Sequence, residues 1–384
     1  MWQGRPTWAE IDLDAVAHNT SELKKRVGGR TELLAVVKAN GYGHGAVAIA
    51  RTALEAGASR LGVACVDEGA QLRKAGISCP ILILGYTPVW EAEKIVHHQL
   101  SPTVGTKQLA LALARFSAEK KAVTQVHVKV ETGMGRFGTP PAEVVEFAQF
   151  LGGLPNLKVD GLYTHFAVAD EEDKGFTHKQ FGCFLEASDQ LSWIPCCHVG
   201  NSATVLDLPD MYLDMVRPGI SLYGIYPSAA VNRSLTLKPA LTLKSRIGRL
   251  HPLAPGDSVS YGRTWIAEKP ARVALITCGY ADGLPRILSN RGSVLVRGVR
   301  APIRGRICMD QCVIDVSHIP DVALDDEVVI IGRQGNEEIT AEEVAALAGT
   351  ISYEILCGIT ARVPRVYIKN GSIWRVETLN EFTE

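Results

Sequence analysis

The sequence has 384 residues, a length that is too great for one small core and favours two domains. Its 40 Lys and Arg residues nearly balance 41 Asp and Glu residues, so the charge does not favour a nucleic acid or an anionic membrane as a partner. No apolar run is long enough to span a bilayer, and the N-terminal residues have no apolar signal-peptide core. We therefore expect a soluble cytoplasmic protein.

The nine cysteines are scattered, with only Cys196 and Cys197 adjacent. Their number is odd and their spacings match no zinc motif. We expect neither a disulfide framework nor a metal site.

The first two thirds of the chain alternates strand-like and helical patterns. Residues 7–13 alternate apolar and polar side chains, and a helical pattern follows up to Gly28. The apolar run 33–37 then predicts a buried strand that ends just before Lys38. Further strand-like runs are 61–66, 81–85, 101–104, 126–131, 159–165, 196–200 and 216–223. Helical patterns are 46–56, 68–75, 91–97, 106–118, 142–150 and 178–191.

Eight strands with helices between them are typical of an α/β (β/α)8 TIM-type barrel, which we place at residues 10–235. A doubly wound open sheet is the alternative arrangement of the same pattern. In a (β/α)8 barrel the active site lies at the C-terminal ends of the strands.

The pattern changes near residue 236, where strand-like runs follow one another without helices. These runs are 241–250, 257–261, 271–277, 293–299, 301–315, 327–331, 365–368 and 372–376. They predict a mainly β domain over residues 236–384, which the N-terminal strand at 1–9 is expected to join. One helix is indicated within it, because Thr340 and Glu343 form a capping box.

Lys38 begins the most informative stretch of the chain. It follows the strand 33–37 and precedes Gly41, Gly43 and Gly45, which allow tight turns and close approach of a ligand. A lysine in this setting is a candidate amine nucleophile for a carbonyl cofactor. An ordinary surface lysine before a glycine-rich turn is the alternative interpretation.

Other polar residues fall at or after the ends of later predicted strands of the barrel. They are Arg136, His165, Asn201, Ser202, Arg217, Gly219 and Ile220. Segments 198–204 and 218–220 offer small residues, backbone N–H groups and a hydroxyl, as the phosphate sites of barrels do. An ordinary helix N-cap at Asn201 is the alternative for the first segment.

Residues 133–138 match the pattern G-x-G-x-x-G, but they follow a fifth strand rather than open a dinucleotide-binding domain. We therefore do not expect nicotinamide or flavin. Arg136 within this segment is better interpreted as a clamp for a carboxylate, because a guanidinium can bind one through two hydrogen bonds.

The motifs together resemble the alanine racemase family along nearly the whole chain. The stretch 36–45, VVKANGYGHG, resembles the pyridoxal-phosphate signature of that family. Further matching segments are 7–12, 63–69, 129–136, 161–167, 198–203, 216–219, 260–262, 279–283, 305–310 and 353–354.

The resemblance implies pyridoxal 5'-phosphate as cofactor and a role for each matching residue. Lys38 would be the Schiff-base lysine and the base for D-alanine, and Tyr261 would be the base for L-alanine. Residues implied to bind the phosphate are Tyr42, Ser202, Gly219, Ile220 and Tyr353. Arg217 would meet the pyridine nitrogen, and His165 would stack on the ring. Arg136 and Met309 would bind the substrate carboxylate, and Lys129 matches a position that is often carbamylated.

Arg217 adds a chemical argument if the cofactor is pyridoxal phosphate. A carboxylate at the ring nitrogen keeps that nitrogen protonated and makes the ring a strong electron sink. Arginine can only donate, so the nitrogen stays unprotonated and negative charge is less delocalised into the ring. Fast reprotonation at Cα is then favoured over decarboxylation or transamination. A structural ion pair is the alternative role for Arg217.

The function implied is interconversion of L- and D-alanine by two bases on opposite faces of Cα, supplying D-alanine for peptidoglycan. The family's head-to-tail homodimer, with active sites shared between subunits, is expected as well. Alternatives are a racemase of another small amino acid such as serine, a decarboxylase of basic amino acids, and a pyridoxal-phosphate carrier without catalysis. Arg217 argues against the decarboxylase, and Tyr261 argues against the carrier.

Overall fold

The computed structural model describes residues 2–379, which form two compact units. The barrel unit consists of Ala15–Gly41 and Ala46–Lys238. The β unit consists of the chain up to Asp14, the short segment Tyr42–Gly45, and the chain from Pro239 onward.

Eight parallel strands form the wall of the barrel unit, in sequential order from β2 to β9. They are β2 (Glu32–Val36), β3 (Arg60–Val63), β4 (Ile81–Ile83), β5 (Ser101–Val104), β6 (Thr124–Lys129), β7 (Leu157–Tyr163), β8 (Cys196–His198) and β9 (Met215–Val216). The first strand pairs with the last, as Leu33 opposite Val216. Backbone hydrogen bonds join the segments of β8 and β9, with the Asp214 N–H donating to the Cys197 carbonyl oxygen at 3.1 Å. The sheet is thus a nearly closed barrel, and the predicted (β/α)8 fold is confirmed over the open alternative.

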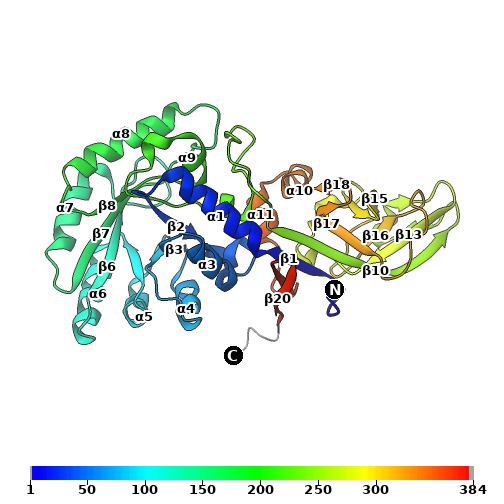
Figure 1. The fold of residues 1–384 in the computed structure, drawn as a ribbon, viewed down its shortest axis with the longest axis horizontal. Coiled ribbons are helices and arrows are strands. Elements are labelled where there is room, and N and C mark those ends of the chain that lie inside the picture. Colours follow the sequence, from blue (N-terminus) through cyan, green and yellow to red (C-terminus); the bar gives the residue numbers. More distant parts are fainter. Residues whose placement is uncertain (1, 380–384) are drawn as a thin grey trace. The chain divides into compact units, whose positions relative to one another are not determined.

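Helices lie outside the barrel wall, where the first precedes β2 and the others connect successive strands (Figure 1). They are α1 (Leu13–Val27), α3 (Ala46–Glu55), α4 (Val66–Lys74), α5 (Ala92–His97), α6 (Lys107–Glu119), α7 (Pro141–Gly152), α8 (Gly175–Asp189) and α9 (Ser202–Asp207). Helix α6 shows how the sequence sets such an element. The Thr106 hydroxyl caps it by accepting from the Leu109 N–H at 3.2 Å, and Leu109 and Leu113 are buried one turn apart.

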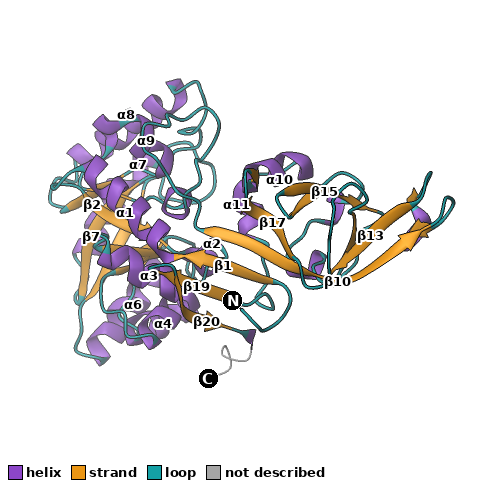
Figure 2. Cartoon of the chain, turned by 45° about the vertical axis from the view of Figure 1, so that its right-hand side comes forward, coloured by secondary structure: helices purple, strands orange, loops and turns teal. Residues whose placement is uncertain are grey.

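The β unit contains a ten-stranded sheet and a separate two-stranded sheet of β11 (Ser258–Val259) and β12 (Trp265–Ile266). The large sheet consists of β1 (Trp8–Asp12), β10 (Leu241–Leu253), β13 (Ala271–Ile276), β14 (Ser293–Val296), β15 (Val299–Arg304), β16 (Cys312–Asp315), β17 (Glu327–Gln334), β18 (Glu337–Ile339), β19 (Arg365–Lys369) and β20 (Ser372–Glu377). The long strand β10 pairs with β1, β13 and β17 (Figure 2). Strand β1 also pairs with β19 in parallel, so both ends of the described chain contribute to this sheet.

Two short helices complete the β unit, α10 (Ala341–Ala348) and α11 (Ser352–Cys357). The Thr340 hydroxyl accepts from the Glu343 N–H at 3.1 Å and so begins α10 where the capping pattern predicted a helix. Single-turn 3-10 helices occur in both units at η1 (Val89–Glu91), η2 (Pro209–Met211), η3 (Ile220–Tyr223), η4 (Tyr261–Arg263), η5 (Tyr280–Asp282) and η6 (Arg286–Leu288). No helix within residues 2–379 has the length and apolarity needed to cross a bilayer.

Several predicted strands are shorter in the structure, and two of them end next to candidate site residues. The run 216–223 is extended only up to Val216, because Pro218 has no N–H to donate and the chain then turns into η3. The run 257–261 ends at Val259, because Ser260 adopts a φ of 62° and redirects the chain. Both turns expose backbone N–H groups or side chains that belong to the candidate site.

Candidate active site

Lys38 lies in a turn of unusual handedness at the C-terminal end of β2. Ala39, Asn40 and Gly41 have φ angles of 51°, 53° and 61°, so α2 (Lys38–Tyr42) contains a left-handed turn. Such a conformation costs about 1–2 kcal/mol for a residue with a side chain. The Glu68 carboxylate stabilises the turn, because it accepts from the Ala39 N–H at 2.7 Å. The position of the lysine is therefore fixed by backbone geometry.

Arg217 follows β9 and is 4% exposed. Its Nη1 donates to His198 Nδ1 at 2.7 Å and to the His198 carbonyl oxygen at 3.0 Å. Its Nη2 donates to the carbonyl oxygens of Thr164 at 2.8 Å and Val199 at 3.1 Å, and lies 3.4 Å from His165 Nδ1. Burial lowers the pKa of Arg217 to about 10. The guanidinium remains a cation at neutral pH, and Nε–H is its remaining donor.

His165 follows β7 and is partly buried next to several cations. Burial lowers its pKa well below 6.5, and the positive charges of Arg217, Arg136, Lys129 and Lys38 lower it further. The ring is therefore neutral at physiological pH. The same interactions indicate that these predicted residues converge on one end of the barrel.

Ser202 forms the centre of the predicted phosphate site. Its Oγ accepts from the Gly219 N–H at 2.9 Å and from the Ser221 N–H at 3.3 Å. Asn201 uses its side-chain oxygen to cap α9, accepting from the Thr204 N–H at 3.1 Å. The amide oxygen of Asn201 is thus already used within the protein.

Ser221 was not singled out from the sequence. It is fully buried, and its Oγ has no hydrogen-bond partner among the residues that the structure describes. A buried hydroxyl without a partner costs free energy unless a ligand binds it. The sequence signal is a serine two positions after Gly219, in a segment already predicted to bind phosphate.

Arg136 projects from a loop that a single carboxylate holds together. The Glu131 carboxylate accepts from the N–H groups of Gly133 at 2.8 Å, Gly135 at 2.9 Å and Arg136 at 3.3 Å. Three such hydrogen bonds shape the turn that presents the exposed Arg136 side chain.

Lys129 ends β6 and is only 2% exposed. Its ammonium donates to the Phe137 carbonyl oxygen and lies 3.8 Å from a Glu131 carboxylate oxygen. Burial lowers its pKa to about 8, against the opposing influence of Glu131. A considerable fraction of this amine is consequently neutral at slightly alkaline pH.

In the β unit, the predicted residues Tyr261 and Met309 belong to two segments that are held together. The Ser260 hydroxyl donates to the Arg306 carbonyl oxygen, and Ser260 Oγ lies 3.4 Å from Cys308 Sγ. Tyr261 is 72% exposed and Met309 is 52% exposed. Tyr261 is therefore not a packed core tyrosine.

The turn at η5 is also hydrogen-bonded to the backbone of the Met309 segment. The Tyr280 N–H donates to the Cys308 carbonyl oxygen at 3.0 Å, and the Ala281 N–H donates to the Met309 carbonyl oxygen at 2.9 Å. A Cβ at Gly279 would lie 2.3 Å from the Met309 carbonyl oxygen, so only glycine fits there.

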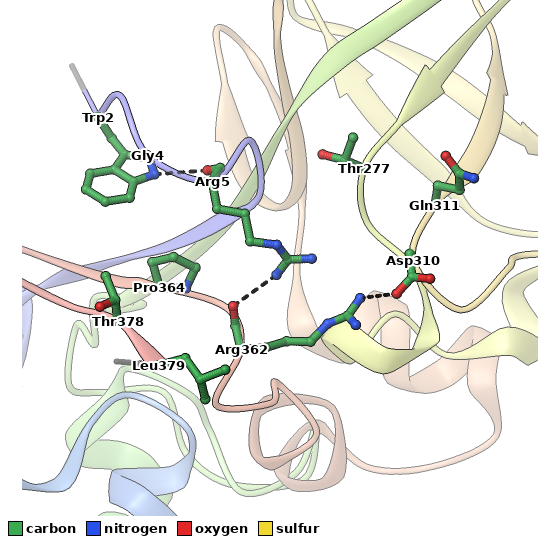
Figure 3. A pocket seen from close by; sticks show the side chains of 10 residues that line it. All are labelled: Trp2, Gly4, Arg5, Thr277, Asp310, Gln311, Arg362, Pro364, Thr378 and Leu379. Carbon is green, nitrogen blue, oxygen red and sulfur yellow. Dashed lines mark hydrogen bonds and ion pairs between the residues drawn. The ribbon is translucent and has the colours of Figure 1, made fainter. Parts of the chain in front are cut away.

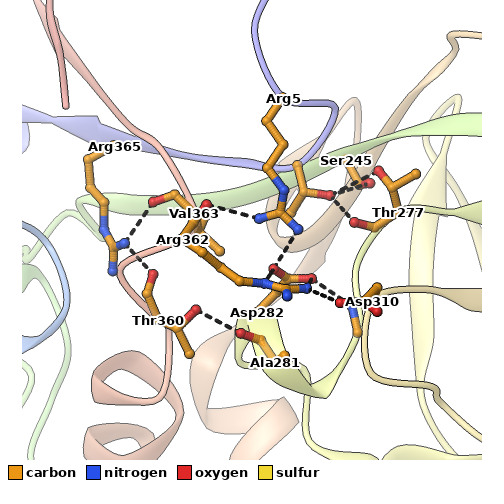
Figure 4. Close-up of polar contacts among 12 residues, drawn as sticks. Arg5, Ser245, Thr277, Ala281, Asp282, Asp310, Thr360, Arg362, Val363 and Arg365 are labelled. Atoms are coloured by element: carbon orange, nitrogen blue, oxygen red, sulfur yellow. Dashed lines mark hydrogen bonds and ion pairs between the residues drawn. The ribbon is translucent and has the colours of Figure 1, made fainter. Parts of the chain in front are cut away.

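Asp282 anchors that turn through a network of ion pairs centred on its own buried carboxylate (Figure 4). Its fully buried carboxylate binds Arg5 at 2.6 Å and Arg362 at 2.7 Å, and accepts from the Gly279 N–H at 3.0 Å. Arg362 also pairs with Asp310, the residue after Met309, at 2.7 Å. The network thus connects the η5 turn with the Met309 segment.

A cavity of about 680 Å³ lies beside these arginines (Figure 3). Its lining residues are Trp2, Gly4, Arg5, Thr277, Asp310, Gln311, Arg362, Pro364, Thr378 and Leu379. None of the predicted catalytic or cofactor-binding residues lines it.

Tyr42 and Tyr353 are also brought together in the β unit, with ring centroids 6.0 Å apart. Tyr353 lies on α11, a helix that the sequence pattern did not indicate. Two phenols predicted to bind phosphate are thus neighbours although they lie 311 positions apart in the sequence.

Comparison with known proteins connects these two units to one family. Residues 11–227 match the family model for the alanine racemase N-terminal domain, and residues 240–367 match that for the alanine racemase C-terminal domain. The chain belongs to the alanine racemase family. The family is one of isomerases, so the protein is an enzyme of this class.

Individual relatives are similar over almost their full length. The alanine racemase of Halothermothrix orenii is 49% identical over 367 residues, which cover 94% of this chain and 97% of the relative. The alanine racemase structure of Clostridium difficile 630 has a TM-score of 0.95 at 38% identity, covering 98% and 99% of the two chains. The alanine racemase structure of Bacillus anthracis with bound L-Ala-P has a TM-score of 0.93 at 38% identity, covering 99% and 100%.

Proposed function

We propose that this protein interconverts L- and D-alanine, with pyridoxal 5'-phosphate as cofactor and Lys38 and Tyr261 as its two bases. The observation that carries the proposal is the buried Arg217, a cation whose contacts are imidazole nitrogens and carbonyl oxygens. Together with Lys38 at the end of β2, it supports a racemase over a decarboxylase.

The residues of the barrel unit fit this cofactor. The Ser221 hydroxyl, which has no partner among the described residues, and the N–H groups around Ser202 suit a phosphate. The neutral His165 ring suits stacking on an aromatic ring. Lys38 would hold the cofactor through its amine, and Arg217 Nε–H would donate to the pyridine nitrogen. Asn201, Gly219 and Ile220 complete the proposed phosphate set of this unit, and the family resemblance alone adds Tyr42 and Tyr353.

The bound cofactor supplies electron withdrawal that acidifies Cα of an amino acid joined to it. Arg217 can only donate a hydrogen bond, so it limits how far charge spreads into the ring. This restraint favours return of a proton to Cα over loss of carbon dioxide.

The two bases perform different proton transfers. Lys38 Nζ would remove the Cα proton of D-alanine, and Tyr261 Oη would remove that of L-alanine from the opposite face. A phenol needs nearby positive charge to act as a base near neutral pH. The strong exposure of Tyr261 supports a shared site, in which the tyrosine of one subunit serves the barrel of a second copy. We propose a homodimer on this basis.

The substrate carboxylate would bind Arg136 and Met309. The pKa of Lys129, lowered to about 8, supports carbamylation of this residue, because only a neutral amine reacts with carbon dioxide. The negative charge of a carbamate would then pair with Arg136. Incorporation of ¹³C-labelled carbon dioxide at Lys129, measured by NMR, tests this part of the proposal.

Further parts of the proposal are supported by family membership alone. We propose a cytoplasmic enzyme whose D-alanine serves peptidoglycan synthesis. A racemase of another small amino acid such as serine is the second candidate, because the two proposed bases act at Cα and not on the side chain of the substrate. A carrier without catalysis is less well supported, since it needs no second base.

The deciding experiment incubates the protein and pyridoxal phosphate with L-alanine in D₂O. Optical rotation reports racemisation, and NMR reports deuterium at Cα. We expect rotation to fall while deuterium enters Cα. Exchange with retained rotation would mean that one base works and that Tyr261 is misassigned. Absence of exchange with alanine but exchange with serine would favour the second candidate.

A further inference from the structure

A chain of buried side chains leads from Arg217 into the interior of the barrel. Arg217 Nη1 lies 2.7 Å from His198 Nδ1, and His198 Nε2 lies 2.9 Å from His127 Nδ1. His127 Nε2 then lies 3.9 Å from an Asp160 carboxylate oxygen. The two histidines come from β8 and β6, and Asp160 comes from β7 between them. None of the three has a part in the proton transfers proposed above.

The far end of this chain reaches the opposite end of the barrel wall. Arg60, the first residue of β3, donates to Asp160 at 2.7 Å and to Glu32, the first residue of β2, at 2.7 Å. Lys158 also pairs with Asp160, at 3.3 Å. Asp160 therefore remains a carboxylate, and Arg60 lowers its pKa.

Because Arg217 can only donate hydrogen bonds, it determines which nitrogen of His198 and of His127 carries the proton. Arg217 has donors only, so His198 Nδ1 must be the acceptor and Nε2 must carry the proton. His198 Nε2 then donates, so His127 Nδ1 must be an acceptor. His127 therefore carries its proton on Nε2, which faces the Asp160 carboxylate. The opposite arrangement would require an imidazole with no proton on either nitrogen.

Packing holds this arrangement in place. His127 and His198 are 1% and 0% exposed. A Cβ at Gly161 would lie 2.2 Å from His127 Nδ1, so the glycine makes room for this ring. The Tyr163 ring stacks on His198 with centroids 4.8 Å apart and an angle of 6° between the planes. Burial lowers the pKa values of both histidines, which agrees with neutral rings.

We propose that His198, His127 and Asp160 form a relay of fixed hydrogen-bond direction that positions Arg217 toward the cofactor ring. Each neutral imidazole accepts on the side of Arg217 and donates on the side of Asp160. The relay keeps an acceptor next to Arg217 Nη1 and holds the guanidinium in place, so that Nε–H would be left to donate to the ring nitrogen of the cofactor. The three are positioning residues, and this inference rests on the proposed function for its effect on turnover.

The first test uses the apoprotein and needs no activity. In protein labelled with ¹⁵N-histidine, long-range ¹H–¹⁵N spectra should show unprotonated Nδ1 and protonated Nε2 for His127 and His198. Spectra of single-histidine variants assign these two among the ten histidines of the chain. Neither signal should titrate between about pH 5.5 and 8, where an ordinary histidine does. A protonated Nδ1 on either ring, or titration in that range, would overturn the relay.

The second test compares two variants at one position in the holoenzyme. His127→Asn retains an acceptor close to the place of Nδ1, whereas His127→Leu fills the space without one. We expect His127→Leu to lower kcat about 10-fold or more with little change in KM, and His127→Asn to stay within about 3-fold of the parent. A role in packing alone predicts the reverse order, because a buried amide fills an apolar space less well than leucine. The reverse order would therefore contradict the proposal.

Asp160 offers an independent variant if those at His127 fail to fold. Asp160→Asn removes the charge that faces His127 while keeping an acceptor, so we expect a kcat loss of about 3- to 10-fold. Lys158→Ala removes an ion pair from the same carboxylate outside the relay and should leave kcat unchanged. Equal effects of the two variants would contradict the relay. If the parent protein does not racemise alanine, the proposed function fails, while the apoprotein spectra still test the relay.

Discussion

The two units present the predicted site residues in opposite ways. In the barrel unit, Arg217 and Ser202 are buried and their polar atoms are mostly bonded to other parts of the protein. In the β unit, Tyr261 and Met309 are largely exposed. The difference supports the proposal that the barrel unit binds the cofactor, whereas Tyr261 and Met309 lie on the surface of the β unit.

The interactions that hold the predicted site residues in place also differ between the two units. Arg217 contacts the neutral His198 ring. The backbone next to Lys38 is held by the hydrogen bond from the Ala39 N–H to Glu68. A charged network around Asp282 stands behind Met309. Variants of the two units should therefore differ in what they lose. Some should lose turnover, some should lose folding stability, and some should change how stability depends on pH.

The largest effect should come from Lys38→Ala in the barrel unit. It removes the amine that would hold the cofactor and move one proton, so we expect turnover to fall by about 10³-fold or more. Loss of covalently bound cofactor should accompany it, measured by mass spectrometry after borohydride reduction. Lys107→Ala, on the surface of α6, is the matched control and should retain both properties. A fully active Lys38→Ala enzyme would contradict the proposed mechanism.

Tyr261→Phe should affect chemistry in the β unit without affecting folding. We expect racemisation to slow by about 10²- to 10⁴-fold, the range for loss of a general base. Proton abstraction from L-alanine should slow more directly than that from D-alanine, as deuterium uptake from either enantiomer would show. Tyr86→Phe, also a strongly exposed tyrosine, serves as control. Unchanged turnover in both directions would remove Tyr261 from its role.

Asp282→Asn should instead destabilise the β unit. It leaves the positive charges of Arg5 and Arg362 facing a buried amide, which costs about 3 kcal/mol or more in free energy of unfolding. Asp310→Asn breaks an exposed contact of Arg362 and should cost less than about 1 kcal/mol. Urea unfolding of both apoproteins measures the difference. Similar costs for the two variants would refute the central role of Asp282.

A pH dependence of stability is expected from the barrel unit. Burial lowers the folded-state pKa of His127 to about 3, so this ring stays neutral at pH values where the unfolded chain, with a pKa of about 6.5, takes up a proton. Its contribution to stability is complete above about pH 6.5 and is lost as the pH falls, by about 1.4 kcal/mol per pH unit. His165 and His198 act in the same direction.

Urea titrations of the apoprotein at several pH values between about 4 and 7 measure this slope. His127→Asn should reduce the slope of unfolding free energy against pH by the contribution of one histidine, which is about 1.4 kcal/mol per pH unit. A slope that does not change would mean that His127 is charged in the folded protein.

Much of the fold could be predicted from local patterns, because burying one face of each strand and helix leaves a periodic trace in the sequence. The strand before Lys38 and the helix after Thr340 were found in this way. Helix α11 was missed, because no side chain caps its first turn and it has only six residues. Tyr353 was found only through the family resemblance.

Several features of the candidate site left no local trace. Glu68 accepts a hydrogen bond from Ala39, which lies 29 positions away in the sequence. His127 and His198 are hydrogen-bonded although they lie 71 positions apart. The sequence also could not show the exposure of Tyr261, because a tyrosine at the end of a predicted strand is expected to pack in the core.

The sequence by itself determined the order of strands and helices, the barrel followed by a mainly β domain, and the lysine signature of the family. Tertiary structure alone decided which polar groups meet inside the barrel, and hence which nitrogen of each imidazole carries the proton. The physical reason is range. Periodicity reflects burial within a few residues, whereas a hydrogen-bond direction depends on partners that only closure of the barrel brings together.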